Sequence, residues 1–391
     1  MSEWIEKRMD EVADFNPRES LKKGSIAKKV AMDKLQPFCR DVPYFEMESF
    51  SGGTKFRNND TIMARITPCL ENGKTAKVNI LEDDEIGFGS TEFIVFRAKE
   101  ETDPDFLYYL VISPAVREPA IKSMVGSSGR QRVQTDVVQK LMVRVPDLNT
   151  QRAIAGVLKS LDDKIAENRK INNNLLEQAL TLYTTQFATL ERNGCVGDYC
   201  SIKSGFAFKS SWWTHNGVKV IKIGSISQDN LNLLECSYVD EDKIDKAKDF
   251  KVGAGDLLIA MTGATIGKFA MVPYSSEMLL VNQRVGKFFL GDNPVEKLPF
   301  IYCTLKQPEV YYEIVNRGQG SAQPNISASD IMSIPCVIPS KERINEFNDT
   351  AQPLFDLIIG NQRENQQLSE LRDSLLPKLM SGELGVSDID L

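Results

Sequence analysis

The second half of the chain is a diverged copy of the first, and this internal repeat constrains the fold more than any other feature. Two long helix-forming segments, 149–187 and 341–380, align without a gap. Asn168 matches Asn361 and Leu175 matches Leu368 at a constant offset of 193 residues (361 − 168 = 193). A globular segment precedes each helix, so we expect approximate internal two-fold symmetry. Such a molecule is suited to a two-fold symmetric partner, and duplex DNA is the commonest one.

The repeat divides the chain into four parts: a globular domain over 1–147, a helical spacer over 148–192, a second domain over 193–340, and a second spacer with a tail over 341–391. Runs of β-branched or alternating apolar residues bounded by Gly, Pro or Asn predict strands starting at Phe93, Lys140, Val218, Asp256, Val285 and Ile334. Short helices are expected from Pro104 and from Leu298. The pattern predicts an α+β fold with two repeated domains on helical spacers.

Both spacers carry an apolar heptad that turns polar at its centre. The seam residues of the first are Ile154, Leu158, Leu161, Ile165, Leu175, Ala179 and Leu182, and those of the second are Phe347, Ala351, Leu354, Ile358, Leu368, Leu375 and Leu379. The central polar residues are Asn168, Asn172, Asn361 and Asn365, and Asn in a coiled-coil core costs stability but fixes register. Antiparallel pairing brings the Asn clusters together, which predicts an intramolecular coiled coil. The alternative is two unrelated helices, each packed on its own domain.

The length of the spacers bears on the target. A helix of about 38 residues is about 57 Å long, and it would hold two domains roughly one DNA turn apart. Antiparallel pairing also inverts one domain relative to the other. The predicted target is therefore bipartite, with two half-sites and an unread gap. Pro353 departs from an ideal helix and is expected to kink the second spacer or delay its start.

Composition limits the classes of protein. The 391 residues are 42% hydrophobic and 26% charged, as in a soluble chain of two or three domains. No apolar run reaches the length of a membrane span, and charges occupy the place of a signal-peptide core. The seven cysteines are scattered without a CxxC pair, which favours reduced thiols in the cytoplasm and argues against a metal module.

Catalytic constellations are missing from the sequence. His215 is the single histidine, which leaves little material for acid–base chemistry. The segment from Gly263 to Lys268 resembles a phosphate loop but has three residues between its glycines and no Ser or Thr after the lysine. We therefore expect a binding protein without catalysis of its own.

Two loops in each half have the residue types that bind DNA. The net charge is −7, but salt screens distant charges, so a local patch of basic residues decides whether a surface binds DNA. Arg, Asn and Gln suit base edges, and Lys, Arg, Ser and Thr suit phosphates. For the first half the predicted DNA-binding residues are Lys55, Arg57, Arg65, Lys74, Ser127, Ser128, Arg130, Gln131 and Arg132. For the second they are Thr262, Thr265, Lys268, Asn282, Gln283, Arg284, Gln319, Ser321, Gln323 and Asn325.

Within these sets, Arg130, Gln131, Arg132, Gln319, Gln323 and Asn325 are the predicted base readers, and Lys55, Arg57, Lys74, Lys268 and Arg284 the predicted phosphate contacts. The alternative for each residue is a solvated loop side chain. Lys74 and Arg284 could equally pair with buried acids.

Several motifs together resemble the specificity subunit of type I restriction-modification systems over essentially the whole chain. They are the end of the second spacer from Leu371 to Leu384, the block from Gly255 to Lys268 followed by Val281 to Gly286, the segment from Gly89 to Arg97, and the two helices themselves. The short segment before Trp4 is a small departure. The resemblance implies two target recognition domains separated by helices that form an antiparallel coiled coil.

The resemblance also implies the partners. These are double-stranded DNA with a split site, two methyltransferase subunits and, in addition, restriction subunits. S-adenosylmethionine would be bound by the methyltransferase, and ATP and Mg by the restriction subunits, so no cofactor is expected in this chain. The sequence lacks the Asn-Pro-Pro-aromatic or Asp-Pro-Pro-Tyr motif of such methyltransferases. Two alternatives remain open: a DNA-independent protein scaffold, which the acidic net charge would suit, and a stand-alone nuclease or methyltransferase, which would need a catalytic motif.

Overall fold

Two compact units make up the computed structural model, which describes residues 4–227, 229–318 and 324–389. The first unit combines Met1–Lys164 with Leu368–Leu391, and the second is Ile165–Gln367. Two long helices, α5 (Leu148–Phe187) and α10 (Lys341–Ser381), each contribute one part of their length to each unit. The units therefore share both helices, whereas the four segments predicted from the sequence follow chain order.

Two four-stranded sheets form the globular part of the first unit. One has the order β2-β9-β6-β7, and its strands are Ala13–Phe15, Phe93–Ala98, Thr61–Ala64 and Thr75–Lys77. The other has the order β4-β3-β8-β5, and its strands are Glu46–Ser49, Ile26–Val30, Gly87–Gly89 and Thr54–Phe56. In the second sheet β3 and β8 run parallel. A further pair, β1 (Ile5–Arg8) and β10 (Met142–Val145), joins the start of the domain to its end.

The second unit repeats this topology. Its first sheet has the order β12-β22-β19-β20, and the strands are Ser201–Ser204, Val285–Phe289, Leu257–Ala260 and Phe269–Met271. Its second sheet has the order β13-β17-β14-β21-β18, with strands Trp213–Thr214, Ser237–Val239, Val218–Ile221, Leu279–Val281 and Lys251–Val252. Here β14 and β21 run parallel, as β3 and β8 do. The pair β11 (Gly194–Cys195) and β23 (Pro335–Cys336) matches β1 and β10; β15 (Ile226–Ser227) and β16 (Asn230–Leu231) form a further pair.

Short helices occur in the same order along the chain in both units. They are α1 (Met9–Val12), α2 (Pro104–Ile112), α3 (Pro114–Lys122) and α4 (Thr135–Gln139) in the first, and α6 (Val196–Tyr199), α7 (Leu298–Lys306), α8 (Pro308–Gly318) and α9 (Ala328–Met332) in the second. Helix α2 begins where Asp103 accepts hydrogen bonds from the backbone N–H groups of Asp105 and Phe106, with proline in the first turn. The expected α+β repeat is confirmed, as are the two short helices.

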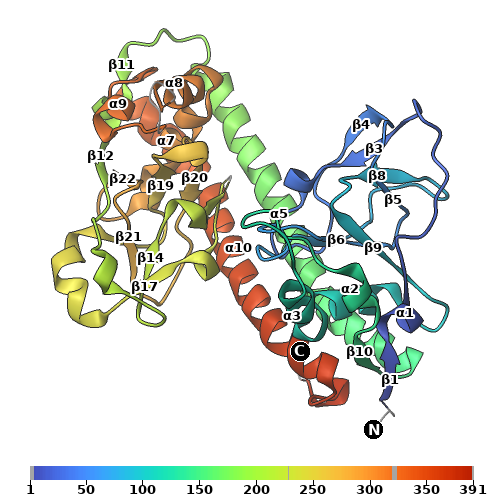
Figure 1. Cartoon of the computed structure of the whole chain (residues 1–391). Coiled ribbons are helices and arrows are strands. Elements are labelled where there is room, and N and C mark those ends of the chain that lie inside the picture. Colours follow the sequence, from blue (N-terminus) through green and yellow to red (C-terminus); the bar gives the residue numbers. More distant parts are fainter. Residues whose placement is uncertain (1–3, 228, 319–323, 390–391) are drawn as a thin grey trace. The chain divides into compact units, whose positions relative to one another are not determined.

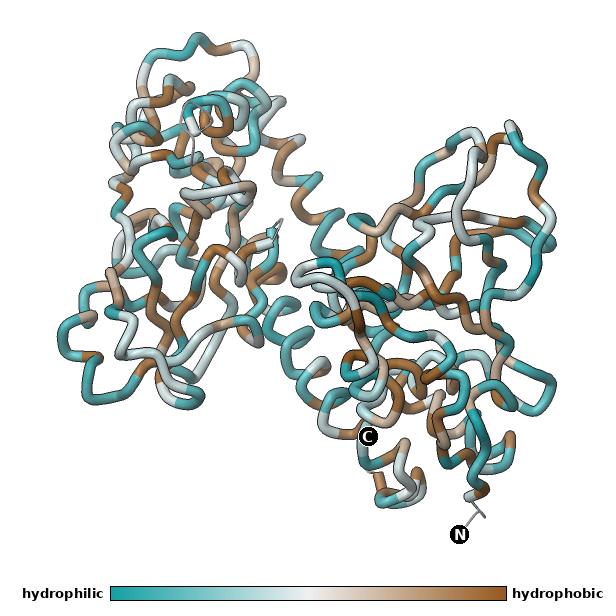
Figure 2. Tube along the Cα trace, in the orientation of Figure 1, coloured by the Kyte–Doolittle hydropathy of each residue, from teal (hydrophilic) through white to brown (hydrophobic). Residues whose placement is uncertain are grey.

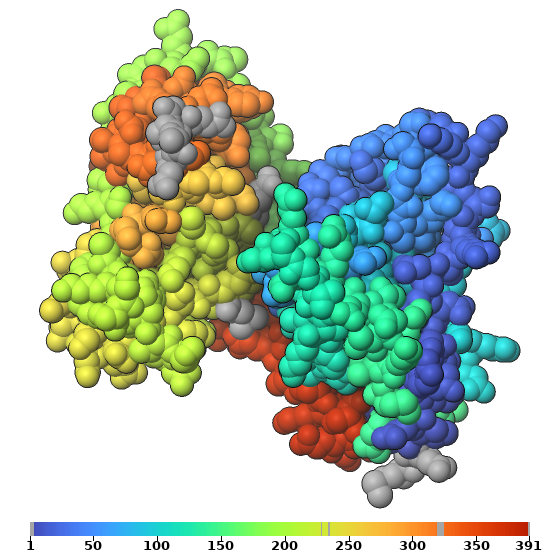
Figure 3. All heavy atoms as spheres, in the orientation of Figure 1, coloured from blue at the N-terminus to red at the C-terminus, as the bar shows by residue number. Residues whose placement is uncertain are grey.

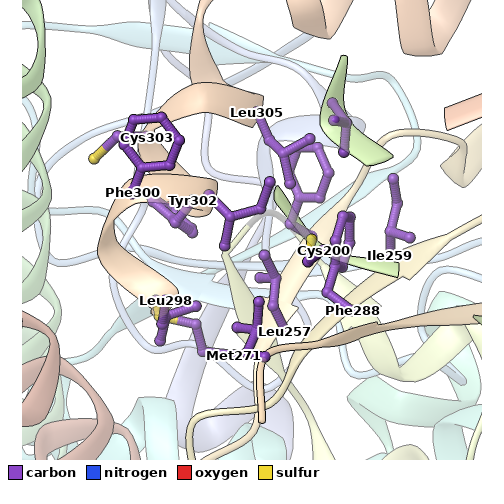
Figure 4. Packing of buried hydrophobic residues seen from close by; sticks show 14 of the residues in the cluster. Cys200, Leu257, Ile259, Met271, Phe288, Leu298, Phe300, Tyr302, Cys303 and Leu305 are labelled. Carbon is purple, nitrogen blue, oxygen red and sulfur yellow. The ribbon is translucent and has the colours of Figure 1, made fainter. Parts of the chain in front are cut away.

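Apolar side chains fill the space between sheet and helices in each unit. In Figure 2 the sheet strands are largely brown and the connecting loops mostly teal. Figure 4 shows Leu257, Ile259 and Phe288 from the first sheet of the second unit in the same buried cluster as Phe300 and Leu305 of α7. Tyr302 from the same helix is almost fully buried, and its hydroxyl donates to Asp229 at 2.7 Å.

The two long helices pack antiparallel. In the first unit the start of α5, with Leu158 and Leu161, shares a core with Leu375 and Leu379 near the end of α10. In the second unit the end of α5 packs on the start of α10, where Ala179 shares a core with Phe355. The expected intramolecular coiled coil is confirmed, and each helix also packs on its own domain.

Two details of the helix prediction were wrong or incomplete. Helix α10 begins at Lys341 and continues through Pro353, so the proline does not delay its start. Complete burial of Ala351 and Phe355 on either side stabilises the helix and offsets the backbone hydrogen bond that a proline removes. The heptad also missed Tyr183 and Phe187, which are buried because the second unit packs Phe300 and Phe347 against them at ring separations of 5.5–5.8 Å.

Candidate nucleic-acid interface

The predicted DNA-binding loop over residues 126–132 of the first unit, which is rich in Gly and Ser, is tied to the end of β6. The backbone N–H of Thr67 donates to Gln131 at 3.0 Å, and that of Val133 donates to the Arg65 carbonyl at 2.8 Å. The N–H of Arg65 in turn donates to the Glu92 carbonyl at 2.9 Å. These bonds bring residues 65, 92 and 132 together, although they are far apart in the sequence.

The same backbone bonds recur in the second unit. Gly263 donates to Pro324 at 2.9 Å, and Ile326 donates to Met261 at 3.0 Å. Met261 donates to the Arg284 carbonyl at 3.0 Å. Three pairs of equivalent positions follow from these bonds: Arg65 with Met261, Glu92 with Arg284, and Arg132 with Asn325.

The side chains at the equivalent positions differ in chemistry. In the first unit Arg132 binds both oxygens of Glu92, with its Nη2 at 2.7 Å from Oε1, and Arg65 Nε lies 3.8 Å from Oε2. The hydrogen bond from Arg132 holds the pKa of the Glu92 carboxyl below its ordinary value, and the charges of both arginines add to this. In the second unit a buried Met261 adjoins an exposed Arg284 and an exposed Asn325.

The loop between these anchors presents polar side chains to solvent. Ser127, Ser128 and Arg130 are exposed and Gln131 is half-buried. Gly126 and Gly129 have φ values of +132° and +77°, which non-glycine residues rarely adopt, so both glycines are needed for this turn. The segment around 125–132 lies on the surface of the first unit, in teal-green in Figure 3. Its counterparts Gln319, Ser321 and Gln323 lie outside the described residues.

Three predicted phosphate contacts of the first unit already have partners within the protein. Arg57 Nε lies 2.7 Å from Glu19, whose side chain is only 4% exposed, and Lys55 Nζ donates to the Glu19 carbonyl at 2.6 Å. Lys74 Nζ donates to the carbonyl of Met32 at 2.9 Å, and not to a buried acid. Their roles in DNA binding stay predictions.

The second unit places its predicted residues in two groups. Gln283, Arg284 and Asn325 are exposed and Lys268 is half-buried, so these four side chains reach solvent. Asn282 is buried, and its Oδ1 accepts from the backbone of Arg284 at 3.3 Å, which gives it a local structural role. Thr265 Oγ1 donates to the Thr262 carbonyl at 3.0 Å, and the buried Thr262 Oγ1 has no partner among the described residues.

Some candidate residues were missed by the sequence analysis. The side chain of Glu92 contacts two predicted residues, Arg65 and Arg132, and the alignment of Glu92 with Arg284 would have revealed it. The second unit also has a surface group of lysine and tryptophan, with Lys222 Nζ 3.7 Å from the ring centre of Trp213. Burial lowers the pKa of Lys222. Trp213 lies on β13, which has no counterpart among the described strands of the first unit, and Lys222 directly follows β14.

The described part of the chain does not meet the requirements of a metal site, a disulfide framework or a membrane-spanning helix. No group of His, Cys, Asp and Glu there has the geometry of a metal site, and His215 is exposed. All seven cysteines are unbridged thiols. Among the described helices, none is long and apolar enough to cross a membrane.

Comparison with known proteins identifies the family. The profile described as the type I restriction modification DNA specificity domain matches residues 1–177 and again 192–370, and so covers both copies of the repeat. The chain belongs to this specificity family. The specificity proteins recognise DNA sequence for type I restriction-modification systems, so the interface described above is a candidate DNA interface.

Named relatives agree with this assignment. The chain is 25% identical over 320 residues to the type I restriction enzyme MjaIX specificity subunit of Methanocaldococcus jannaschii, with 74% of this chain and 71% of the relative covered. It is 23% identical to the HindI specificity subunit of Haemophilus influenzae, with 75% and 81% covered. The crystal structure of the type I system S subunit from M. genitalium has the same fold, with a TM-score of 0.50, 17% identity, and 97% and 96% of the two chains covered.

Proposed function

We propose that each globular domain reads one half of a bipartite DNA site, with the paired helices setting the unread gap. The observation that carries the proposal is the set of equivalent positions. The same backbone hydrogen bonds hold Arg65, Glu92 and Arg132 in one unit, and Met261, Arg284 and Asn325 in the other. A shared scaffold with different side chains is what two readers of different half-sites require.

The side chains suggest what each half-site contains. Arg130 and Arg132 have the donors that suit guanine, and Glu92 could accept from the amino group of cytosine. The first half-site should therefore include a G·C pair. Asn325 suits adenine and Arg284 suits guanine or a phosphate, so the second half-site should include an A·T pair. Half-sites of unlike sequence follow from this difference.

The helices and the end of the chain are the proposed docking surfaces for two methyltransferase subunits, one per half, to which restriction subunits add. Large apolar side chains point outward on the helices: Ile171 is 38% and Leu357 56% exposed. This chain would recognise DNA and leave catalysis to its partners. The methyltransferase would bind S-adenosylmethionine, and the restriction subunits ATP and Mg.

Methylation mapping tests the proposal. Methylated adenines are mapped by sequencing in cells that carry this chain with its methyltransferase partner, and in cells where Arg130, Gln131 and Arg132 are replaced by Ala. We expect a bipartite motif with the intact chain. The substitutions should weaken or abolish the sequence preference in the first half-site of the methylated motif, because all three residues lie in the first unit. The preference in the second half-site should stay the same.

A matched set in the second unit controls for general damage. Replacing Arg284 and Asn325 by Ala should loosen the second half-site only. If the intact chain binds its methyltransferase partner but gives no motif, the DNA-independent scaffold is favoured. The salt dependence of DNA binding separates the two functions as well, because a DNA reader loses affinity log-linearly as salt rises.

A further inference from the structure

A buried ion pair lies where α5 and α10 meet in the first unit. Arg372 Nη1 donates to Asp162 Oδ1 at 2.7 Å, and both side chains are only 5% exposed. The second oxygen of Asp162 accepts from the hydroxyl of Tyr109 at 2.8 Å. Arg372 also donates to the Phe38 carbonyl at 3.3 Å and to Asp373. Both charges are therefore fully satisfied by this one arrangement of the helices.

The internal repeat places no such pair in the second unit. At the offset of 193 residues, Asp162 corresponds to Phe355 and Arg372 corresponds to Ala179. Phe355 and Ala179 are completely buried in one apolar core. The helix pair is thus charged at one of the two equivalent places and apolar at the other.

This difference matters because the two helices are similar enough to pair with their own kind. In an antiparallel pair of two α5 helices from separate chains, the repeat would set Asp162 opposite Ala179. In a pair of two α10 helices it would set Arg372 opposite Phe355. Each like pairing would bury charges without a counter-charge on the facing helix, and Asp162 would keep the hydrogen bond from Tyr109.

The central asparagines do not distinguish these pairings. Asn168 Nδ2 donates to Asn365 Oδ1 at 3.0 Å, and Asn361 Nδ2 donates to Asn172 Oδ1 at 2.8 Å. Under the same offset Asn168 corresponds to Asn361 and Asn172 to Asn365. Asparagine would therefore meet asparagine in all three pairings. The bonds between asparagines can therefore fix the register, but they cannot fix which helix is the partner.

We propose that the Asp162–Arg372 ion pair selects the pairing of α5 with α10 of the same chain and disfavours pairing with a second copy of the chain. Two α5–α10 pairs contain two complete ion pairs, and rearrangement into one α5–α5 and one α10–α10 pair destroys both. Removing one partner of a buried ion pair is strongly unfavourable. The exchange into like pairs should therefore be disfavoured by about a hundredfold or more relative to a chain without these charges.

Cleavage of the folded full chain tests this selection. A protease site inserted after the exposed Glu191, between α5 and β11, allows the folded chain to be cut once. Unlabelled and isotopically labelled cut proteins are mixed, passed through mild denaturant, returned to buffer and weighed by native mass spectrometry. The comparison protein carries Asp162→Asn and Arg372→Met. The packing differences between like and unlike pairs are otherwise the same in the wild-type and the neutral protein. A difference between the two proteins in the amount of like pairs therefore reports the effect of the charges.

The wild-type fragments should exchange label but return only as unlike pairs. The neutral variant should also form like pairs, with an exchange constant about a hundredfold higher. Like pairs at equal levels in both proteins would overturn the proposal. A second measurement on the intact chain covers the case in which fragments fail to exchange. A double-mutant cycle of Asp162→Asn and Arg372→Met should show coupling of about tenfold or more in the unfolding constant, and additive effects would contradict the proposal.

Discussion

Replacement of Arg132 by Ala should change which DNA sequence is bound more than it changes the stability of the protein. Arg132 holds Glu92 through both oxygens, but its side chain is 46% exposed. An ion pair that is this open to solvent contributes little to the stability of the fold, because water and salt screen it. An arginine that binds a guanine edge contributes about 1–3 kcal/mol of discrimination against other bases, which is roughly 5- to 150-fold in relative affinity. The effect on discrimination should therefore exceed the effect on unfolding.

The assay is fluorescence anisotropy of the assembly with its methyltransferase, on duplexes that carry each base substitution in the first half-site. Arg132→Ala should flatten the preference at one or two positions there and leave the second half-site unchanged. Arg57→Ala is the matched control, since Arg57 is 45% exposed and likewise binds a glutamate. If Arg57 contacts a phosphate, its loss weakens binding equally for all sequences and lowers the salt slope by about one. Uniform weakening by Arg132→Ala would refute the assignment of Arg132 as a base reader.

Three further predictions concern stability and reactivity. Gly156→Ala in the third turn of α5 should stabilise the chain by about 1 kcal/mol in thermal unfolding, since nothing lies within 4 Å of the added methyl group. Gly205→Ala should destabilise the chain because the methyl group would collide with the backbone oxygens of Val281 and Asn282 at the end of β21, and a stable Gly205→Ala protein would contradict this packing. Burial raises the pKa of Cys200 to about 12, so an alkylating reagent at pH 8 should modify Cys200 only when the protein unfolds. The partly exposed Cys195 should be modified in the folded protein, and mass spectrometry of the labelled peptides would show the difference. Burial alone would raise the pKa of Glu19, but hydrogen bonds from two arginines outweigh it and hold the pKa below 4.5. The stabilisation from Glu19 is therefore present above about pH 4.5 and is lost as pH falls through the lower pKa of the folded state. When the free energy of unfolding is measured by urea titration at a series of pH values, Glu19→Gln should make it fall less steeply toward acid pH. An unchanged slope would show that Glu19 does not contribute.

The helices and the repeat could be predicted because their signal is local and continuous. The helix expected over 149–187 is observed as α5 (Leu148–Phe187), and the sequences of the two long helices align without a gap. Asp147 accepts hydrogen bonds from the N–H groups of Asn149 and Thr150, which explains the start of α5. The strand from Phe93 could also be predicted, because it begins with four consecutive apolar residues, all of which are buried.

Apart from the strand at Val218, which is β14, the second sheet of each unit was not predicted. Strand β4 (Glu46–Ser49) is polar and only half-buried, and β3 pairs in parallel with β8, which lies about sixty residues further along the chain. The candidate interface was predicted in its residue types but not in its contacts. The ion pairs of Arg132 with Glu92 and of Arg57 with Glu19 each join segments about forty residues apart, and only the folded sheets bring them together.

The division of the helices between the units also sets the order in which the protein can fold as it is synthesised. The second unit is one continuous stretch, Ile165–Gln367, whereas the first needs Leu368–Leu391 to complete its core with Leu375, Leu379 and Met380. About 200 residues separate the two parts, which is roughly 10–40 s of translation at about 5–20 residues per second. Of the two units, the first to be synthesised is thus the later one to be completed, and part of its apolar core stays uncovered until the end of α10 has left the ribosome.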